Sequence, residues 1–433
     1  MTSARAEHSR RRVPSSSPHV IPAVTERHCQ EAAFLFRLRR EYVKRADVGL
    51  EDLTDLDERL ESHLDGIRVA QGRGWQACQR ALADAGTGAV FVAATIALQS
   101  KAWNRIAPLL AIVEADECLW PGLIGAFGWA SSGDLQGVVK SLLVSDVAFY
   151  RRVGLAACVA QRADPGRALE SACADPDETL GRLSLRAAAE LGRTDLLPVC
   201  LAQLEVTGPE RAFWASWAAV LLGDRTHALA QLARAALSST LAPNLRRRAL
   251  HTSLRTMDIA EGHELLRDLA NVTGQRRLMI EGIGVLGNAL YVPWLIEQMA
   301  DPEVARLAGE ALGLMTGQDL VAAKLTQSAA TARASQGAAQ PKEEDLDEYH
   351  SLPSPDPVKL AQWWQAEGFR WGAGVRRFVG EPPSSAHCRA ILKKGRQRQR
   401  SAAAQYLCLS APGTPLFDVR APAWRQIRLL EGA

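Results

Sequence analysis

The stretch from Tyr291 to Gly317 reads YVPWLIEQMADPEVARLAGEALGLMTG and contains two apolar patterns separated by a break. In each half, large apolar residues recur every three or four positions, as they do on one face of a helix. Asp301 and Pro302 stand between the halves. Asp favours the N-cap and Pro the first helical position, so we expect Asp301 to cap a second helix that begins at Pro302. The stretch predicts a helix, a turn and a second helix.

Similar stretches recur upstream at a spacing of about thirty residues, the range typical of helical repeats. The Leu-Gly pairs that end at Gly192 and Gly223 are 31 residues apart, and later pairs end at Gly287 and Gly313. Each hairpin carries an apolar stripe too large to bury alone, so neighbouring hairpins must stack. Alternating β-branched runs with hairpin turns are nearly absent. The predicted fold class is all-α, an α-solenoid of about seven or eight helical hairpins.

Composition excludes several classes of protein. The chain has 433 residues, 47% hydrophobic and 23% charged, which excludes a single small domain and global disorder. Its 51 Lys and Arg against 48 Asp and Glu leave no strong overall field. The longest apolar run is about half of the roughly twenty residues needed to span a bilayer, so we expect no membrane insertion. Eight dispersed cysteines predict reduced thiols and a cytoplasmic location.

Changes in composition divide the chain into five segments. Leu53 to Ile67 form an amphipathic pattern whose acidic face, including Asp57 and Glu61, is expected to be solvated rather than catalytic. The predicted segments are a disordered arm (1–22), an N-terminal helical cap (23–86), the repeat solenoid (87–320), a flexible Ala-rich and acidic linker (321–352) and a C-terminal helical segment (353–433).

Motifs near both ends of the chain resemble an uncharacterised family of bacterial HEAT-repeat proteins. They are Glu31-Ala-Ala-Phe-Leu-Phe36, the stretch Leu53–Gly66, Pro353-Ser-Pro-Asp-Pro357 with Trp363-Trp364, the stretch Gly395–Ala404 and the stretch Pro415–Gln426. The resemblance covers nearly the whole chain and implies HEAT-like repeats. Members of that family are often encoded beside type VI secretion components, which implies an accessory or adaptor role. No catalytic residue comes with the resemblance.

Gly282, Gly284 and Gly287 formally match the dinucleotide fingerprint G-x-G-x-x-G. That site requires a strand before the glycines and a helix that opens on them. Here the glycines end a helical pattern in register with the other Leu-Gly ends, which favours a helix terminus. The nine histidines are dispersed, and no set of converging ligands can be assembled from their spacing. We therefore predict no cofactor and no metal.

The C-terminal segment carries a local positive charge. From Lys359 to Ala433 there are thirteen Lys or Arg and four Asp or Glu. Such a face suits an acidic protein surface or, with aromatic residues nearby, nucleic acid. Arginines within the repeats, such as Arg186 and Arg306, are expected to stabilise neighbouring turns. The candidate partner-binding residues are Trp363, Trp364, Lys393, Lys394, Arg396, Arg398 and Arg400.

Together these patterns predict a non-enzymatic scaffold or adaptor that binds another protein along its concave surface. The resemblance makes a type VI secretion effector, spike or loading component the first expected partner. The alternative is a nucleic-acid-binding protein or a DNA glycosylase-like enzyme with a basic concave surface, which makes nucleic acid the second candidate partner after protein. The sign of the charges on that surface distinguishes the two, because phosphate binding needs a continuous row of cations.

Overall fold

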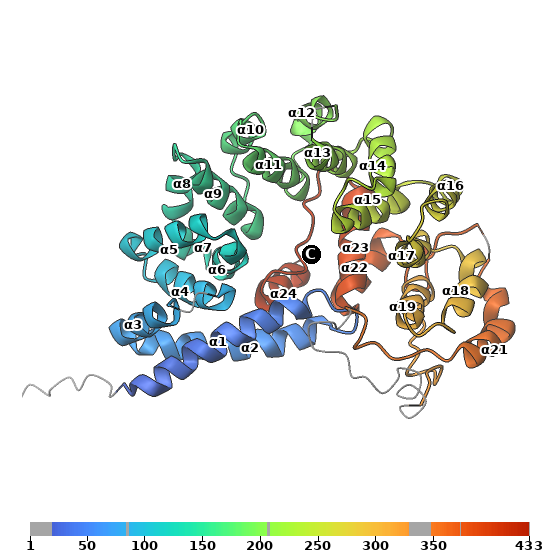
Figure 1. Ribbon diagram of the computed structural model, residues 1–433, viewed down its shortest axis with the longest axis horizontal. Helices are drawn as coiled ribbons and strands as arrows, with labels where there is room; N and C mark the ends of the chain where they lie inside the picture. The colour runs from blue at the N-terminus through green and yellow to red at the C-terminus, as the bar shows by residue number, and fades with distance from the viewer. Residues whose placement is uncertain (1–19, 84–85, 206–207, 329–347, 373, 433) are drawn as a thin grey trace, which may run out of the picture.

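The computed structural model describes residues 20–83, 86–205, 208–328, 348–372 and 374–432. Within these ranges the ordered elements are helices, and the β-type pairing consists of the isolated bridges Thr326 to Pro355 and Phe378 to Glu381. Consecutive helices pack along an arc, which confirms the predicted all-α solenoid (Figure 1). Of the expected disordered arm, residues 1–19 lie outside the described part, and α1 begins at Pro22.

The helices fall into three groups along the chain. The N-terminal group is α1 (Pro22–Tyr42), α2 (Leu50–Val69) and α3 (Gln71–Ala81). The arc contains α4 (Thr87–Gln99), α5 (Trp103–Ala115), α6 (Trp120–Trp129), α7 (Ser132–Leu135), α8 (Val138–Leu143), α9 (Ala148–Gln161), α10 (Arg167–Cys173), α11 (Glu178–Glu190), α12 (Leu197–Ala202), α13 (Pro209–Leu222), α14 (His227–Leu237), α15 (Pro243–Thr256), α16 (Ile259–Ala270), α17 (Arg276–Leu286), α18 (Val292–Gln298) and α19 (Ala305–Thr316). The C-terminal group is α21 (Pro357–Glu367), α22 (Ser385–Lys394), α23 (Gln397–Ser410) and α24 (Ala423–Glu431).

The hairpin of α18 and α19 differs from expectation at its turn. The second helix begins at Ala305, not at Pro302. The Asp301 carboxylate accepts the backbone N–H of Glu303 at 3.0 Å, and the Asp301 carbonyl accepts that of Ala305 at 2.8 Å. Asp301 and Pro302 therefore form a turn ahead of α19, because the aspartate side chain closes a local Asx turn.

The glycine-rich stretch ends a helix, as the spacing predicted. Gly282 and Gly284 are buried inside α17, and Gly287 follows its last residue with φ +69°. A Cβ atom at Gly284 would lie 2.8 Å from the Cα atom of Ala311, so the glycine permits close packing of α17 against α19. The glycines of this stretch therefore serve the packing of α17 and the end of that helix.

Figure 1 shows α22, α23 and α24 of the C-terminal group inside the arc, whereas α21 lies at its outer end against α18. Inside the arc, α23 packs against α13 and α15, and α24 packs against α2 of the N-terminal group. Residues 411–422 connect the two as a segment without helix, here called the strap. The inner wall, along which the sequence predicts a protein partner, is therefore covered in part by the chain's own C-terminal helices.

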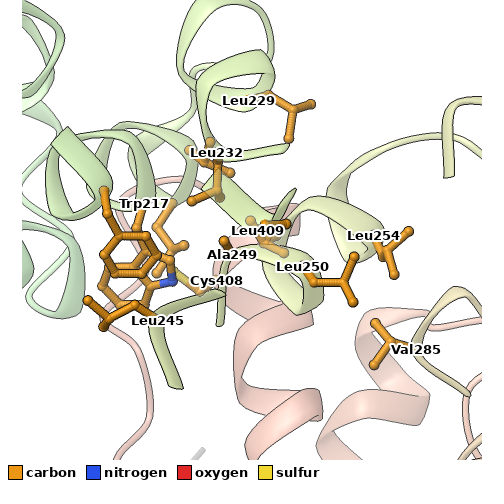
Figure 2. Close-up of a cluster of buried hydrophobic side chains, with 14 of the residues drawn as sticks. Trp217, Leu229, Leu232, Leu245, Ala249, Leu250, Leu254, Val285, Cys408 and Leu409 are labelled. Atoms are coloured by element: carbon orange, nitrogen blue, oxygen red, sulfur yellow. The ribbon is translucent and has the colours of Figure 1, made fainter. Parts of the chain in front are cut away.

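One hydrophobic core joins this group to the repeats. Trp217, Leu250 and Leu254 from the arc lie beside Cys408 and Leu409 of α23 in the same buried cluster (Figure 2). Burying a large aliphatic side chain contributes roughly 1.5 to 3 kcal/mol, so these contacts hold α23 firmly. The C-terminal group is part of the repeat core.

The predicted linker is packed at both of its described ends. Leu325 is buried, and its carbonyl accepts the N–H of Asp356 at 2.9 Å. Gln327 donates its N–H to the carbonyl of Ser354 at 3.0 Å. At the other end Tyr349 is buried in the centre of the molecule. The expected flexible stretch therefore does not include these residues, and residues 329–347 lie outside the described ranges.

The acidic face of α2 is only partly solvated. Asp65 is exposed as expected, but Asp57 is 4% exposed and faces α24. Its carboxylate binds Arg39 of α1 and the backbone N–H of Ala423. The expectation for Asp57 is wrong because the sequence pattern does not show that the C-terminal group returns to cover this helix.

Candidate functional site

A cavity of about 930 Å³ lies between the inner helices of the arc and the C-terminal group. Its walls come from α11, α15, α17 and α19 on one side and from α23 and the strap on the other. Eight Lys or Arg side chains and five Asp or Glu side chains line it. The lining is therefore mixed in sign, unlike the continuous basic row that duplex DNA would require.

Glu281 on α17 is the centre of a network at one end of this cavity. Its carboxylate accepts hydrogen bonds from Nε of Arg247 at 2.5 Å and from the hydroxyl of Tyr349 at 2.7 Å. Burial alone would raise the pKa of Glu281, but His251 and Arg247 lower it to about 2. Burial lowers the pKa of His251 to about 4 although Nε2 lies 3.3 Å from Glu281. At neutral pH the network holds a carboxylate beside a neutral imidazole.

Arg398 extends this network into the C-terminal group. Its guanidinium pairs with Glu310 at 2.7 Å and with Glu348 at 2.9 Å. The same guanidinium lies 4.2 Å from the ring centroid of Tyr349, and Nε donates to the carbonyl of Lys44 at 3.1 Å. Two carboxylates, an aromatic ring and a carbonyl thus hold Arg398. Arg398 therefore links α23 to Lys44, just after α1, and to Glu310 on α19.

Glu190 on α11 occupies the opposite end of the cavity, where cations predominate. Nε of Arg186 lies 2.6 Å from one carboxylate oxygen and Nη1 of Arg162 lies 3.0 Å from the other. Burial would raise the pKa of Glu190, but these two arginines lower it to about 2. One buried carboxylate is therefore shared by two guanidinium groups.

Arg248 on α15 stands in the same end of the cavity without a polar partner. Among the described residues its guanidinium has no ion pair or hydrogen bond, and its contacts are the rings of Trp214 and Trp217, with centroids 5.2 and 5.3 Å away. Burial lowers the pKa of Arg248 to about 10, and repulsion from Arg186 and Arg420 adds to the effect. Arg248 is an unpaired cation held in place by aromatic rings.

The strap forms one wall of the cavity at the end that contains Glu190 and Arg248. It is held there mainly through its backbone. Leu416 donates its N–H to the carbonyl of Glu190 at 3.0 Å, and its own carbonyl accepts from Arg162 at 2.7 Å. Farther along, Arg39 donates to the carbonyls of Arg420 and Ala421. These bonds do not depend on the strap's side chains, so the strap is held through its main chain.

The repeat-end glycines give the C-terminal group its close fit. A Cβ atom at Gly192 would lie 2.3 Å from the carbonyl oxygen of Gly413, and one at Gly287 would lie 2.0 Å from that of Arg377. A Cβ atom at Gly223 would lie 3.4 Å from the side chain of Pro412, which is an ordinary contact. The Leu-Gly ends that reveal the repeats are thus also docking positions for the C-terminal group.

The structure separates the predicted partner-binding residues. Trp363 and Trp364 lie half-buried on α21 at the outer end of the arc, with ring centroids 5.9 Å apart. Lys393, Lys394 and Arg396 are exposed where α22 leads into α23. The two groups lie on different elements, α21 against α18 and α22 against α23.

Two of the predicted residues are not on the surface. Arg398 lies in the cavity network, and Arg400 is fully buried. Arg400 donates to the carbonyl of Leu392 at 2.8 Å and to side-chain oxygens of Gln397 and Gln426. The prediction of a surface role for Arg400 is wrong, since its donors bind α22, α23 and α24 to one another.

Apart from Arg398, the cavity residues were not predicted as a site. Arg186 was expected to be architectural, and Arg248 was not singled out. A signal was present: Arg246, Arg247 and Arg248 form a run of three cations inside a repeat helix. On a helix these three side chains diverge over more than half of its circumference, so they cannot all lie on one outer face.

No known family model matches the chain, and neither a curated protein nor a solved structure matches it. Over the described ranges, no group of three or more His, Cys, Asp or Glu side chains is arranged to hold a metal ion. None of the helices in the described part is long and apolar enough to cross a bilayer.

Proposed function

We propose that the protein is a non-enzymatic cytoplasmic scaffold that binds another protein. The observation that supports this most is that the inner side of the molecule already holds a polypeptide, the strap, through side-chain hydrogen bonds to its carbonyl groups from Arg162 in the arc and Arg39 of α1. A helical-repeat wall of this kind offers a long surface with binding groups supplied by successive helices. The chemistry suits a peptide ligand better than a reacting small substrate.

The strap occupies the inner wall, so the proposal places the partner on an exposed surface. Arg389, Lys393, Lys394 and Arg396 form a basic edge on α22 and the loop that follows it. Such an edge favours a partner with an acidic surface, since complementary charge speeds and orients association. The resemblance at both ends of the chain makes a type VI effector, spike or loading component the first partner to examine.

Nucleic acid remains the competing ligand for this basic edge. The mixed charge of the cavity and the covered inner wall both give the DNA proposal less support than the protein proposal. Phosphate-dominated binding weakens steeply with salt, so a shift assay on duplex DNA at two salt concentrations separates the alternatives.

Affinity capture tests the proposal. The bait is the full chain, and the lysate is from a bacterium that carries a type VI system. The variant combines Lys393→Glu, Lys394→Glu and Arg396→Glu. A matched control combines Lys140→Glu, Arg234→Glu and Arg267→Glu, which change the same charge at exposed positions of the outer helices α8, α14 and α16.

We expect a type VI component to copurify with the wild-type chain and with the control, and to be lost with the basic-edge variant. Circular dichroism melts of all three proteins establish that the variants are folded. Capture of chaperones or nucleic acid alone, or equal capture by the basic-edge variant, contradicts the proposal.

A further inference from the structure

We propose that the cationic end of the central cavity, formed by Arg186, Arg248 and Arg420, binds the phosphate group of a small polar phosphate monoester. This site is separate from the basic edge and does not depend on a protein partner. The three guanidinium groups come from α11, α15 and the strap, and all three line the same cavity.

The charge at this end is not balanced within the protein. Arg186 and Arg162 share the single carboxylate of Glu190. Among the described residues, neither Arg248 nor the side chain of Arg420 has an ion pair or a hydrogen bond. The acidic groups at this end of the cavity are Glu190 and Asp418. The arginines there are Arg162, Arg186, Arg248 and Arg420. The surplus of two positive charges matches a phosphate monoester, which carries about −1.5 to −2 at neutral pH.

The position of Arg248 suits anion binding. Trp214 and Trp217 lie against its guanidinium at 5.2 and 5.3 Å, and they fix the group without using its N–H donors. Arginine presents these donors as a fork that matches phosphate oxygens. The negative charge of an arriving anion would also offset the cost of burial and the repulsion that lower the pKa of Arg248.

The rest of the cavity limits what the phosphate can be attached to. A volume of about 930 Å³ is enough for a drug-sized molecule. At the other end Glu281, Glu310 and Glu348 pair with Arg247 and Arg398, so these two guanidinium groups are already neutralised and have less affinity for a second anionic group. Trp217 is 1% exposed and has Arg248 against its ring, so it offers no open face to a nucleobase. Asn244 and Ser401 are exposed side chains that also line the cavity and supply polar groups, which favours a sugar phosphate over a nucleotide.

The experiment is titration calorimetry with the full-length protein in 0.15 M NaCl. The phosphate probes are inorganic phosphate, glucose 6-phosphate and ribose 5-phosphate. Glucose lacks the anion, citrate carries carboxylates instead, and ATP tests the nucleotide class. We expect saturable binding of at least one sugar phosphate, tighter than inorganic phosphate, and no binding of glucose.

Arg248→Met and Arg420→Gln should each weaken that binding at least tenfold. Arg267→Met, at an exposed position of α16, is the control and should leave it unchanged. Because Arg248 is unpaired, Arg248→Met should also leave the melting temperature of the free protein unchanged or raise it, whereas a purely structural arginine would lower it. If Arg248→Met does not fold, the affinity of the exposed Arg420→Gln variant for the sugar phosphate tests the proposal by itself.

The proposal is overturned if no phosphate probe binds, or if the sugar phosphates bind Arg248→Met or Arg420→Gln as tightly as wild type. Binding of citrate or ATP tighter than that of both sugar phosphates also overturns it, since the site would then select carboxylates or nucleotides.

Discussion

Arg39 of α1 and Asp57 of α2 form a buried ion pair, with 2.6 Å between Nε and Oδ1, and both residues also bind the C-terminal group. Asp57 accepts the N–H of Ala423 at 2.7 Å, while Arg39 donates to the carbonyls of Arg420 and Ala421 at 2.9 and 2.8 Å. The pair thus connects the first hairpin of the chain to its last helix, and this contact of the N-terminal hairpin with the C-terminal group is here called the closed ring.

Removing one partner of this pair should be costly. Asp57→Ala leaves Arg39 buried without its carboxylate, and breaking a buried pair in this way costs roughly 3 to 5 kcal/mol. We expect a lower free energy of unfolding in urea and faster proteolysis near residues 411–424. Asp65→Ala is the control on the same helix, because Asp65 is 63% exposed and its removal should cost less than about 1 kcal/mol. Equal effects of the two changes would contradict the closed ring.

The docking glycines give a second test. At Gly287 an added Cβ would lie 2.0 Å from the carbonyl oxygen of Arg377, whereas at Gly274 nothing lies within 4 Å. Both residues have positive φ, +69° and +77°, so Gly→Ala imposes a similar backbone strain of about 1 to 2 kcal/mol at each. We expect Gly287→Ala to lower the free energy of unfolding by about 2 kcal/mol more than Gly274→Ala. The reason is that the new methyl group at position 287 would also have to push the backbone of Arg377 away. Similar losses would mean that residues 376–380 do not dock there.

The free energy of unfolding should fall in acid because His251, Glu190 and Glu281 become protonated. The pKa of His251 is about 4 in the fold against 6.5 ordinarily, so its neutral form stabilises the protein above pH 6.5 and this contribution is lost as pH falls toward 4. Glu190 and Glu281 have pKa values of about 2 against 4.5, so their contributions are complete above pH 4.5 and are lost toward pH 2.

Urea unfolding at pH 7, 5.5 and 4 measures this. We expect His251→Gln to remove about 2 kcal/mol of the loss between pH 6.5 and 4, while the exposed His227→Gln leaves the profile unchanged. A wild-type profile flat from pH 7 to 4, or one that His251→Gln does not alter, would count against a buried neutral imidazole.

The stacking of the last repeats can be tested through their core. Leu312 on α19 is completely buried in the main cluster. Leu312→Asp places an unpaired charge there and should cost several kcal/mol, enough to unfold the end of the arc. We expect the helical signal at 222 nm to be lost at a lower temperature than in the wild type. An unchanged melting curve would show that Leu312 does not face the core.

The repeats could be predicted from sequence because each hairpin is local: the apolar spacing in 291–317 defines two helices and the face they bury. The site could not be predicted in the same way. Asp57 and Ala423 are 366 positions apart, and nothing in either pattern shows that they meet. Likewise the run Gly395–Ala404 shows clustered cations, but only the packing shows that Arg400 is buried and Lys393 is not.

Hydrogen exchange over residues 411–424 measures the closure of the ring most directly. In the closed ring the N–H of Leu416 is bonded to the carbonyl of Glu190 and that of Ala423 to the carboxylate of Asp57. We predict that both amides exchange at least a hundredfold more slowly than in an unstructured peptide, and that Asp57→Ala speeds exchange at Ala423. Exchange of both amides at unprotected rates, while α11 and α15 stay protected, would show an open arc and contradict the account.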